Sequence, residues 1–141
     1  MNKKRLKTVC LGRGAVLLAF SIVGYAGCWY VFDAESRLNR ESSFAAVYEW
    51  VRIDPIPSSA TNISISTRGT AFTREFTLQF DAPKDKVLTW LKESPGPSET
   101  VPTTKPNGAK HYEIKPGSRA TKAEIFVSPN GEHVRIHTYW S

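Results

Sequence analysis

The stretch FTREFTLQF, residues 72–80, decides the fold of this chain. Its large apolar residues share one parity and its polar residues share the other, so that Phe72, Phe76, Leu78 and Phe80 oppose Thr73, Glu75, Thr77 and Gln79. Side chains of a β-strand point alternately to the two faces of a sheet, so this pattern predicts a strand with one buried side. Arg74 breaks the apolar parity, and we expect it near a turn at the rim of the sheet.

Four more segments show the same period of two. Their inward positions are Ile63 and Ile65, then Tyr112 and Ile114, then Ala123, Ile125 and Val127, and last Val134, Ile136, Thr138 and Trp140. The last two segments are joined by Ser128-Pro129-Asn130-Gly131, a hairpin signal because Asn and Gly accept positive φ. The sequence therefore predicts five strands with mostly antiparallel pairing.

One helix is predicted between the second and third of these strands. Pro83 suits its first turn, because the missing N–H of proline is not needed there. Its apolar stripe consists of Val87, Leu88 and Leu91, with Trp90 beside it. The prolines after Ser94 end the helix.

Residues 94–109 hold four prolines and two glycines and little that is apolar, which predicts a surface loop. The resulting order is β-β-α-β-β-β. It predicts an α+β fold, a two-layer domain over residues 60–141 with a five-stranded, mostly antiparallel sheet and one packed helix.

A short amphipathic helix is predicted before this domain, over residues 43–53. Phe44, Val47, Tyr48 and Val51 follow the i, i+3, i+4, i+7 spacing of one helical face. Pro55 and Pro57 end the segment. We expect the helix to pack on the domain, and which face of the sheet it covers stays open at this point.

The N-terminal part of the chain has the composition of a membrane anchor. Residues 15–32 carry no formal charge, and a helix of that length covers about 27 Å, close to the thickness of bilayer hydrocarbon. Basic residues at positions 3–7 precede it, and Trp29 and Tyr30 mark the far end, where aromatic rings favour the headgroup region. The pattern predicts an N-terminal transmembrane helix with a cytoplasmic N-terminus.

We accordingly divide the chain into four parts. These are a cytoplasmic basic flank (1–8), a transmembrane signal anchor (9–32), a juxtamembrane spacer with the short helix (33–59) and an extracytoplasmic α+β domain (60–141). This organisation predicts a single-pass membrane protein whose C-terminal domain is periplasmic or extracellular.

Two other interpretations of the anchor stay open. A signal peptide would be cleaved near Ala26-Gly27, but the apolar run continues past that site. In a lipoprotein, Cys28 would be the possible lipidation site. The sequence Tyr25-Ala26-Gly27-Cys28 resembles a bacterial lipobox at its last three positions and departs from it at Tyr25. We expect Cys28 to be an apolar residue of the membrane helix.

The charge balance excludes a nucleic-acid-binding surface of the usual kind. Five of the nineteen basic residues lie before residue 14, and all thirteen acidic residues lie at or after Asp33. The rest of the chain therefore has a formal charge of only +1 and no basic run. Both cysteines, Cys10 and Cys28, fall in the apolar segment, which excludes a disulfide or a cysteine-ligated metal in the domain.

No catalytic, cofactor-binding or metal-binding residues are predicted. His133 and His137 share a face, but their Cα atoms are about 13 Å apart along a strand, too far for one zinc ion. His111 could join one of them only across strands, so we expect solvated histidines. The sequence has no Gly-x-Ser-x-Gly elbow and no phosphate-binding glycine loop, and its acidic residues are scattered. The pattern favours a module that is not an enzyme.

The outward sheet face is the one candidate site. Aromatic residues lie there among charges, a composition that is typical of protein interfaces. The candidate interaction residues are His111, Phe126, Arg135, His137 and Tyr139. Two classes of function follow. The first is a membrane-tethered binding or accessory module of the cell envelope, with a protein or peptide partner and no cofactor. The second is an extracytoplasmic enzyme or small-ligand carrier.

The first prediction concerns orientation. An alkaline phosphatase fused after Ser141 should be active, because the basic flank retains the N-terminus in the cytoplasm and the domain is exported. A reporter that works only in the cytoplasm should be silent in the same position. The reverse pattern of the two activities would contradict the membrane topology given above.

Overall fold

The computed structural model describes residues 39–70 and 72–141. The basic flank (1–8), the transmembrane segment (9–32) and Cys28 lie outside these residues, so their assignments stay predictions. Within the described ranges, no helix is long and apolar enough to cross a membrane. A compact unit spans Arg40–Ser141, and the following description concerns this unit.

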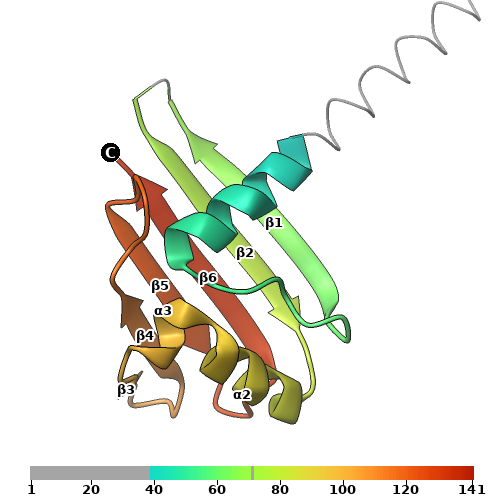
Figure 1. The fold of residues 1–141 in the computed structure, drawn as a ribbon. Coiled ribbons are helices and arrows are strands. Elements are labelled where there is room, and N and C mark those ends of the chain that lie inside the picture. Colours follow the sequence, from blue (N-terminus) through green and yellow to red (C-terminus); the bar gives the residue numbers. More distant parts are fainter. Residues whose placement is uncertain (1–38, 71) are drawn as a thin grey trace, which may run out of the picture. The chain divides into compact units, whose positions relative to one another are not determined.

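The described residues form one sheet and its covering helices. In chain order they are a helix over residues 39–51, β1 (Thr61–Gly69), β2 (Arg74–Asp81), α2 (Lys84–Glu93), α3 (Pro95–Ser98), β3 (Thr103–Thr104), β4 (Lys110–Ile114), β5 (Lys122–Val127) and β6 (His133–Trp140). The sheet order is β1-β2-β6-β5-β4-β3, and all neighbouring strands are antiparallel. Helix 39–51 and α2 lie on the same face of the sheet (Figure 1). The predicted α+β class is confirmed.

The predicted number of strands is wrong, because the sheet has six strands rather than five. The sixth is β3, which pairs with Lys110 and His111 at the edge of the sheet. It lies inside the predicted loop over residues 94–109, which also contains the short helix α3 and the fully buried Ser94. A two-residue strand has no alternation that a periodicity analysis can detect, so only the tertiary pairing identifies it.

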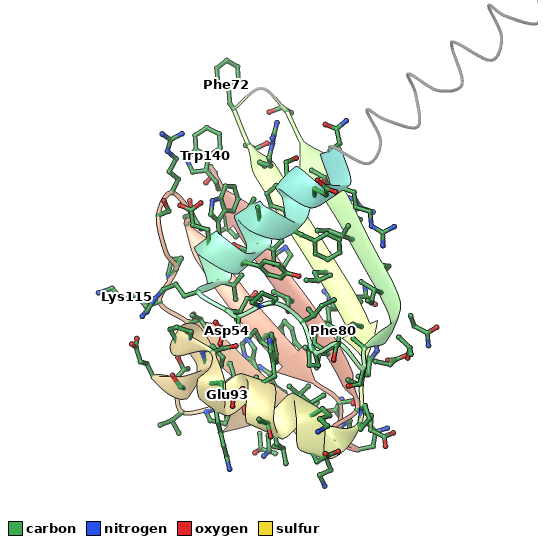
Figure 2. The ribbon with its side chains drawn as sticks, turned by 45° about the vertical axis from the view of Figure 1, so that its right-hand side comes forward. Asp54, Phe72, Phe80, Glu93, Lys115 and Trp140 are labelled. Atoms are coloured by element: carbon green, nitrogen blue, oxygen red, sulfur yellow. The ribbon has the colours of Figure 1, made fainter. Side chains whose placement is uncertain are left out.

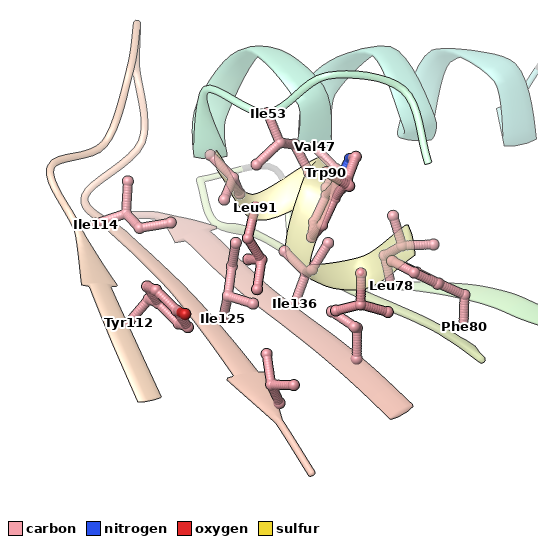
Figure 3. Packing of buried hydrophobic residues seen from close by; sticks show 14 of the residues in the cluster. Val47, Ile53, Leu78, Phe80, Trp90, Leu91, Tyr112, Ile114, Ile125 and Ile136 are labelled. Atoms are coloured by element: carbon pink, nitrogen blue, oxygen red, sulfur yellow. The ribbon is translucent and has the colours of Figure 1, made fainter. Parts of the chain in front are cut away.

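The hydrophobic core lies between this sheet and the two helices. Its strand residues are those of the predicted inward parity, among them Phe76, Leu78, Phe80, Tyr112, Ile114, Ala123, Ile125, Val127, Val134 and Ile136. Figure 3 shows strand residues such as Leu78, Ile125 and Ile136 facing Val47 of helix 39–51, Ile53 just after that helix, and Trp90 and Leu91 of α2. The period of two therefore located the buried face correctly in the four central strands.

The alternation fails at two strand ends. Phe72 is 81% exposed, because β2 begins only at Arg74 and Phe72 belongs to the preceding turn, where the strand period does not apply. Trp140 is 38% exposed, because it is the last residue of β6 and pairs with Arg74 at the rim of the sheet. The predictions of Phe72 and Trp140 as inward residues are therefore wrong.

The buried stripe of α2 also differs from the prediction. The helix buries Val87, Trp90 and Leu91, whereas Leu88 is exposed. The Trp90 ring stands edge-on to Phe80, with 5.4 Å between the ring centroids and an interplanar angle of 89°. This geometry is favourable for aromatic pairs. The i, i+3, i+4 spacing of the three buried residues is centred on Trp90 rather than on Leu88.

Helix 39–51 is part of the same core. Val47 and Val51 are fully buried, and Trp50 stands edge-on to Phe76 with the ring centroids 5.2 Å apart. The end of the helix is held by the N–H of Gly96, which donates to the carbonyl of Arg52 at 2.7 Å. The helix covers the face that α2 also covers, so no described element lies over the opposite face (Figure 1).

The core generates a stability prediction. Replacement Phe80→Ala should lower the free energy of unfolding by about 3–5 kcal/mol, because Phe80 is fully buried and the deletion leaves a cavity. The matched control is Phe72→Ala, which removes the same ring from an exposed turn and should change stability by less than about 0.5 kcal/mol. Denaturant unfolding of the full chain in detergent, followed by circular dichroism, measures both. Equal losses in the two variants would contradict the assignment of the core.

Candidate functional site

The uncovered face of the sheet brings the predicted interaction residues together. Cross-strand pairing places His111 of β4 opposite Phe126 of β5, and Phe126 opposite Arg135 of β6. His137 and Tyr139 follow on the same face of β6, with their ring centroids 6.1 Å apart. All five residues therefore form one continuous surface, which we call the open face.

One row of the open face is a stack of planar groups. The rings of His111 and Phe126 lie 4.4 Å apart and are nearly parallel, with an angle of 8° between them. The guanidinium carbon of Arg135 lies 5.7 Å from the centroid of the Phe126 ring, within the range of a cation–π contact. Arg135 is exposed and Phe126 is half-buried, so the row presents an aromatic ring and a cation to the surroundings.

The neighbouring row is organised around the carboxylate of Glu124. Its Oε1 lies 2.9 Å from Nζ of Lys122 and 3.1 Å from Nε2 of His111, and its Oε2 lies 3.5 Å from Nδ1 of His137. The other ring nitrogen of His137, Nε2, lies 3.0 Å from Oε1 of Glu75. The polar network therefore crosses four strands, from β2 through β6 and β5 to β4.

Burial makes Glu124 the central group of this network. The residue is only 8% exposed. Burial by itself would raise the pKa of Glu124, but hydrogen bonds from Lys122, His111 and His137 outweigh it and lower the pKa below the ordinary carboxyl value. The hydrogen bond to Glu124 correspondingly raises the pKa of Lys122. A buried carboxylate keeps its negative charge at little cost only while its hydrogen-bond partners remain in contact with it.

The expectation that the histidines are solvated is wrong for two of them. The side chains of His111 and His137 are 12% and 21% exposed, and each contacts a carboxylate. No pattern in the sequence indicates that Glu75 and Glu124 are their partners. Glu75 and His137 are separated by 62 positions, and their contact depends on the pairing of β2 with β6. Strand parity could place both residues on one face but could not supply the register.

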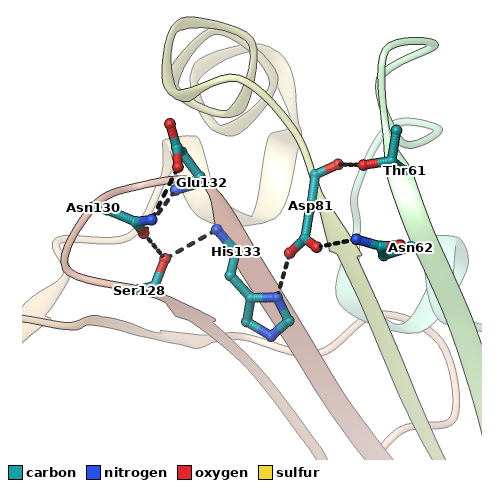
Figure 4. Close-up of polar contacts among 7 residues, drawn as sticks. All are labelled: Thr61, Asn62, Asp81, Ser128, Asn130, Glu132 and His133. Atoms are coloured by element: carbon teal, nitrogen blue, oxygen red, sulfur yellow. Dashed lines mark hydrogen bonds and ion pairs between the residues drawn. The ribbon is translucent and has the colours of Figure 1, made fainter.

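The third histidine belongs to a separate cluster at the other end of β6. Nδ1 of His133 lies 2.6 Å from Oδ1 of Asp81, and Nδ2 of Asn62 donates to Oδ2 of Asp81 at 2.7 Å (Figure 4). Hydrogen bonds from Asn62 and His133 lower the pKa of Asp81. Although Ser128 lies nearby, its hydroxyl contacts Asn130 and the backbone N–H of His133. These contacts do not form a nucleophilic triad.

The histidine-carboxylate contacts also do not amount to a metal centre. Within residues 39–70 and 72–141, no group of three His, Cys, Asp or Glu side chains is arranged to hold a metal ion. A small pocket of about 90 Å³ lies between α2 and the turn after β5, lined in part by Leu88, Tyr112 and Pro129. It is smaller than the roughly 300–1,000 Å³ pockets that hold small organic ligands.

Comparison with known proteins adds no functional information to this geometry. No protein-family model, no curated protein and no solved structure matches the chain. The open face, with the buried Glu124 in its neighbouring row, is therefore identified from its own physical chemistry alone.

The lowered pKa of Glu124 generates a prediction for acid stability. A carboxyl group whose pKa is lower in the folded state stabilises the fold above its unfolded pKa, and this stabilisation is lost as the pH falls through the folded pKa. At neutral pH, Glu124→Gln should therefore lower the free energy of unfolding by about 1.5–3 kcal/mol, the typical contribution of a hydrogen bond to a charged group. At acid pH the two chains should converge.

Urea unfolding between neutral and acid pH tests this expectation. The control is Glu93→Gln, which removes an exposed carboxylate at the end of α2 and should leave the profile of the parent chain unchanged. Asp81 also has a lowered pKa, so part of the acid sensitivity should persist in Glu124→Gln. A difference between Glu124→Gln and the parent that does not depend on pH would contradict the role of the Glu124 charge.

Proposed function

We propose that this chain is a membrane-anchored binding or accessory module of the cell envelope, whose extracytoplasmic domain binds a protein or peptide partner through the open face. The anchor is the apolar segment over residues 9–32, with the N-terminus in the cytoplasm. The open face comprises His111, Phe126, Arg135, His137 and Tyr139.

This proposal rests on the observation that helices cover only one face of the sheet. Both long helices pack on the inner face, and the opposite face presents a stacked aromatic ring and an arginine over an ordered polar network. Aromatic residues and arginine are enriched in protein interfaces and carry much of their binding energy. The network also holds His111 and His137 in fixed positions, which reduces the entropy that binding would cost.

The second class of function receives less support. An enzyme or a small-ligand carrier generally uses a concave pocket with a few converging polar groups. The pocket beside α2 is small, and the histidine–carboxylate contacts of the open face lie on a sheet surface rather than in that pocket. The described geometry therefore favours recognition of an extended surface over enclosure of a small molecule.

Site-specific photocrosslinking in the envelope tests the proposal. A photoreactive amino acid at position 135 lies on the open face, and the same amino acid at position 92 lies on the exposed side of α2. We expect a discrete crosslinked product from position 135 and none from position 92, because only the open face contacts the partner. Replacement Phe126→Ala should weaken the product from position 135, since it removes the aromatic ring of the open face that lies beside this position.

The proposal fails if position 135 gives no product, or if positions 135 and 92 give the same products. The stability of Phe126→Ala must be measured alongside, because Phe126 is half-buried. A variant that keeps its unfolding midpoint and still crosslinks as well as the parent would exclude the aromatic row from the interface.

A further inference from the structure

The turn between β1 and β2 is built so that it displays an aromatic ring. The N–H of Thr70 donates to the carbonyl of Thr73, and the N–H of Phe72 donates to the hydroxyl of Thr70 at 3.2 Å. Gly69 has a φ of +142°, and a Cβ at this position would lie 2.1 Å from the Thr73 carbonyl oxygen. These contacts and the required glycine hold Gly69 and Thr70 close to Thr73, and the side chain of Phe72 is 81% exposed.

A second aromatic ring and two cations accompany Phe72 at this end of the domain. The pairing of β2 with β6 places Trp140 opposite Arg74, and Figure 2 shows Phe72 and Trp140 at the same end of the sheet. Arg68 lies one residue before Gly69, and both arginines are exposed. We call the group of Arg68, Phe72, Arg74 and Trp140 the hairpin pole. The hairpin pole thus combines two exposed aromatic rings with two exposed arginines at one end of the sheet.

The hairpin pole lies at the end of the domain where the chain enters from its N-terminal side. The hydroxyl of Ser43, near the first described turn of helix 39–51, contacts the hydroxyl of Thr67 in β1 at 3.3 Å. Thr67 is two residues from Gly69 at the end of β1. Figure 1 likewise shows the first turns of the helix beside the half of β1 and β2 that leads to their connecting turn.

The number of residues between the predicted anchor and helix 39–51 limits how far this end of the domain can lie from the membrane. The last residue of the predicted anchor, Phe32, precedes Arg40 by eight positions. Even a fully extended chain of this length spans at most about 28 Å. An anchored domain is therefore restricted to the immediate neighbourhood of the bilayer, whatever conformation the connection has.

We propose that the hairpin pole rests on the anionic surface of the bilayer that holds the anchor. Phe72 and Trp140 enter the headgroup region, where aromatic rings are favoured, and Arg68 and Arg74 contact lipid phosphates. This inference depends on the proposed membrane anchoring. It goes beyond the anchor because it gives the domain a defined contact with the lipid.

A bilayer fits these residues better than a protein partner does. The rings are at a protruding turn and a strand end rather than in a groove, and the connecting chain already holds them near lipid. Arginine suits phosphate because its planar group can donate several hydrogen bonds to one phosphate group. The carboxylate of the nearby Glu75 contacts Nε2 of His137 at 3.0 Å.

Fluorescence quenching by lipid tests the contact. In the full chain with Cys10→Ser and Cys28→Ser, the change Phe72→Cys provides one site for an environment-sensitive fluorophore. The matched control is Val101→Cys, which labels another highly exposed apolar position, 91% exposed and outside the hairpin pole. Both proteins are reconstituted into vesicles of phosphatidylcholine and phosphatidylglycerol that carry a nitroxide on the lipid. The label at position 72 should be quenched several-fold more strongly than the label at position 101.

Each outcome decides the proposal. A chain that does not float with the vesicles would refute the anchor itself. A chain that floats but is quenched no more at position 72 than at position 101 would overturn the lipid contact and leave the anchor intact. A blue-shifted label at position 72 without lipid quenching would indicate a protein contact and also overturn it. If the label at position 72 is quenched as strongly in vesicles of phosphatidylcholine alone as in the mixed vesicles, the contribution of the anionic headgroups is overturned.

Discussion

The architecture depends on the indole of Trp90, which joins three parts of the chain. Its ring packs edge-on against Phe80 in β2, while its Nε1 donates to the carbonyl of Asp54 at 3.0 Å. The N–H of Asp54 in turn donates to the hydroxyl of Ser94, which is fully buried at the end of α2. The segment after helix 39–51 is thereby attached to α2, and both helices are held on the same face of the sheet. Burial of the indole is favourable because its single N–H has a partner.

The one-sided arrangement has a consequence for the other face. A sheet with both helices on one side must present the opposite parity of every strand to its surroundings. Here that parity includes Glu124, a nearly buried carboxylate that requires compensation by Lys122, His111 and His137. Replacing a complete buried network of this kind with well-packed apolar residues commonly costs little stability, whereas removing one partner alone is destabilising. The network is therefore better explained by the positions it gives to the outward side chains than by the stability it contributes.

The proposed lipid contact and the proposed partner contact are compatible because they involve different surfaces of the domain. The hairpin pole lies at the ends of β1, β2 and β6, whereas the open face extends across the strands from β6 to β4. With the pole on the lipid, the sheet stands on the bilayer and its open face points along the membrane surface. A partner in the same membrane or in the envelope would then reach the open face from the side.

The sequence by itself determined the α+β class, the inward parity of the central strands and the turn at Asn130-Gly131, because these depend on local periodicity and local backbone preferences. It also placed His111, Phe126 and Arg135 on one face. Only the tertiary structure decided what these residues contact, since cross-strand register is a long-range property that no local pattern records. For the same reason, the alternation did not show that Phe72, at its end, is exposed. The strand Thr103–Thr104 was not predicted either, because it is defined only by its pairing with β4.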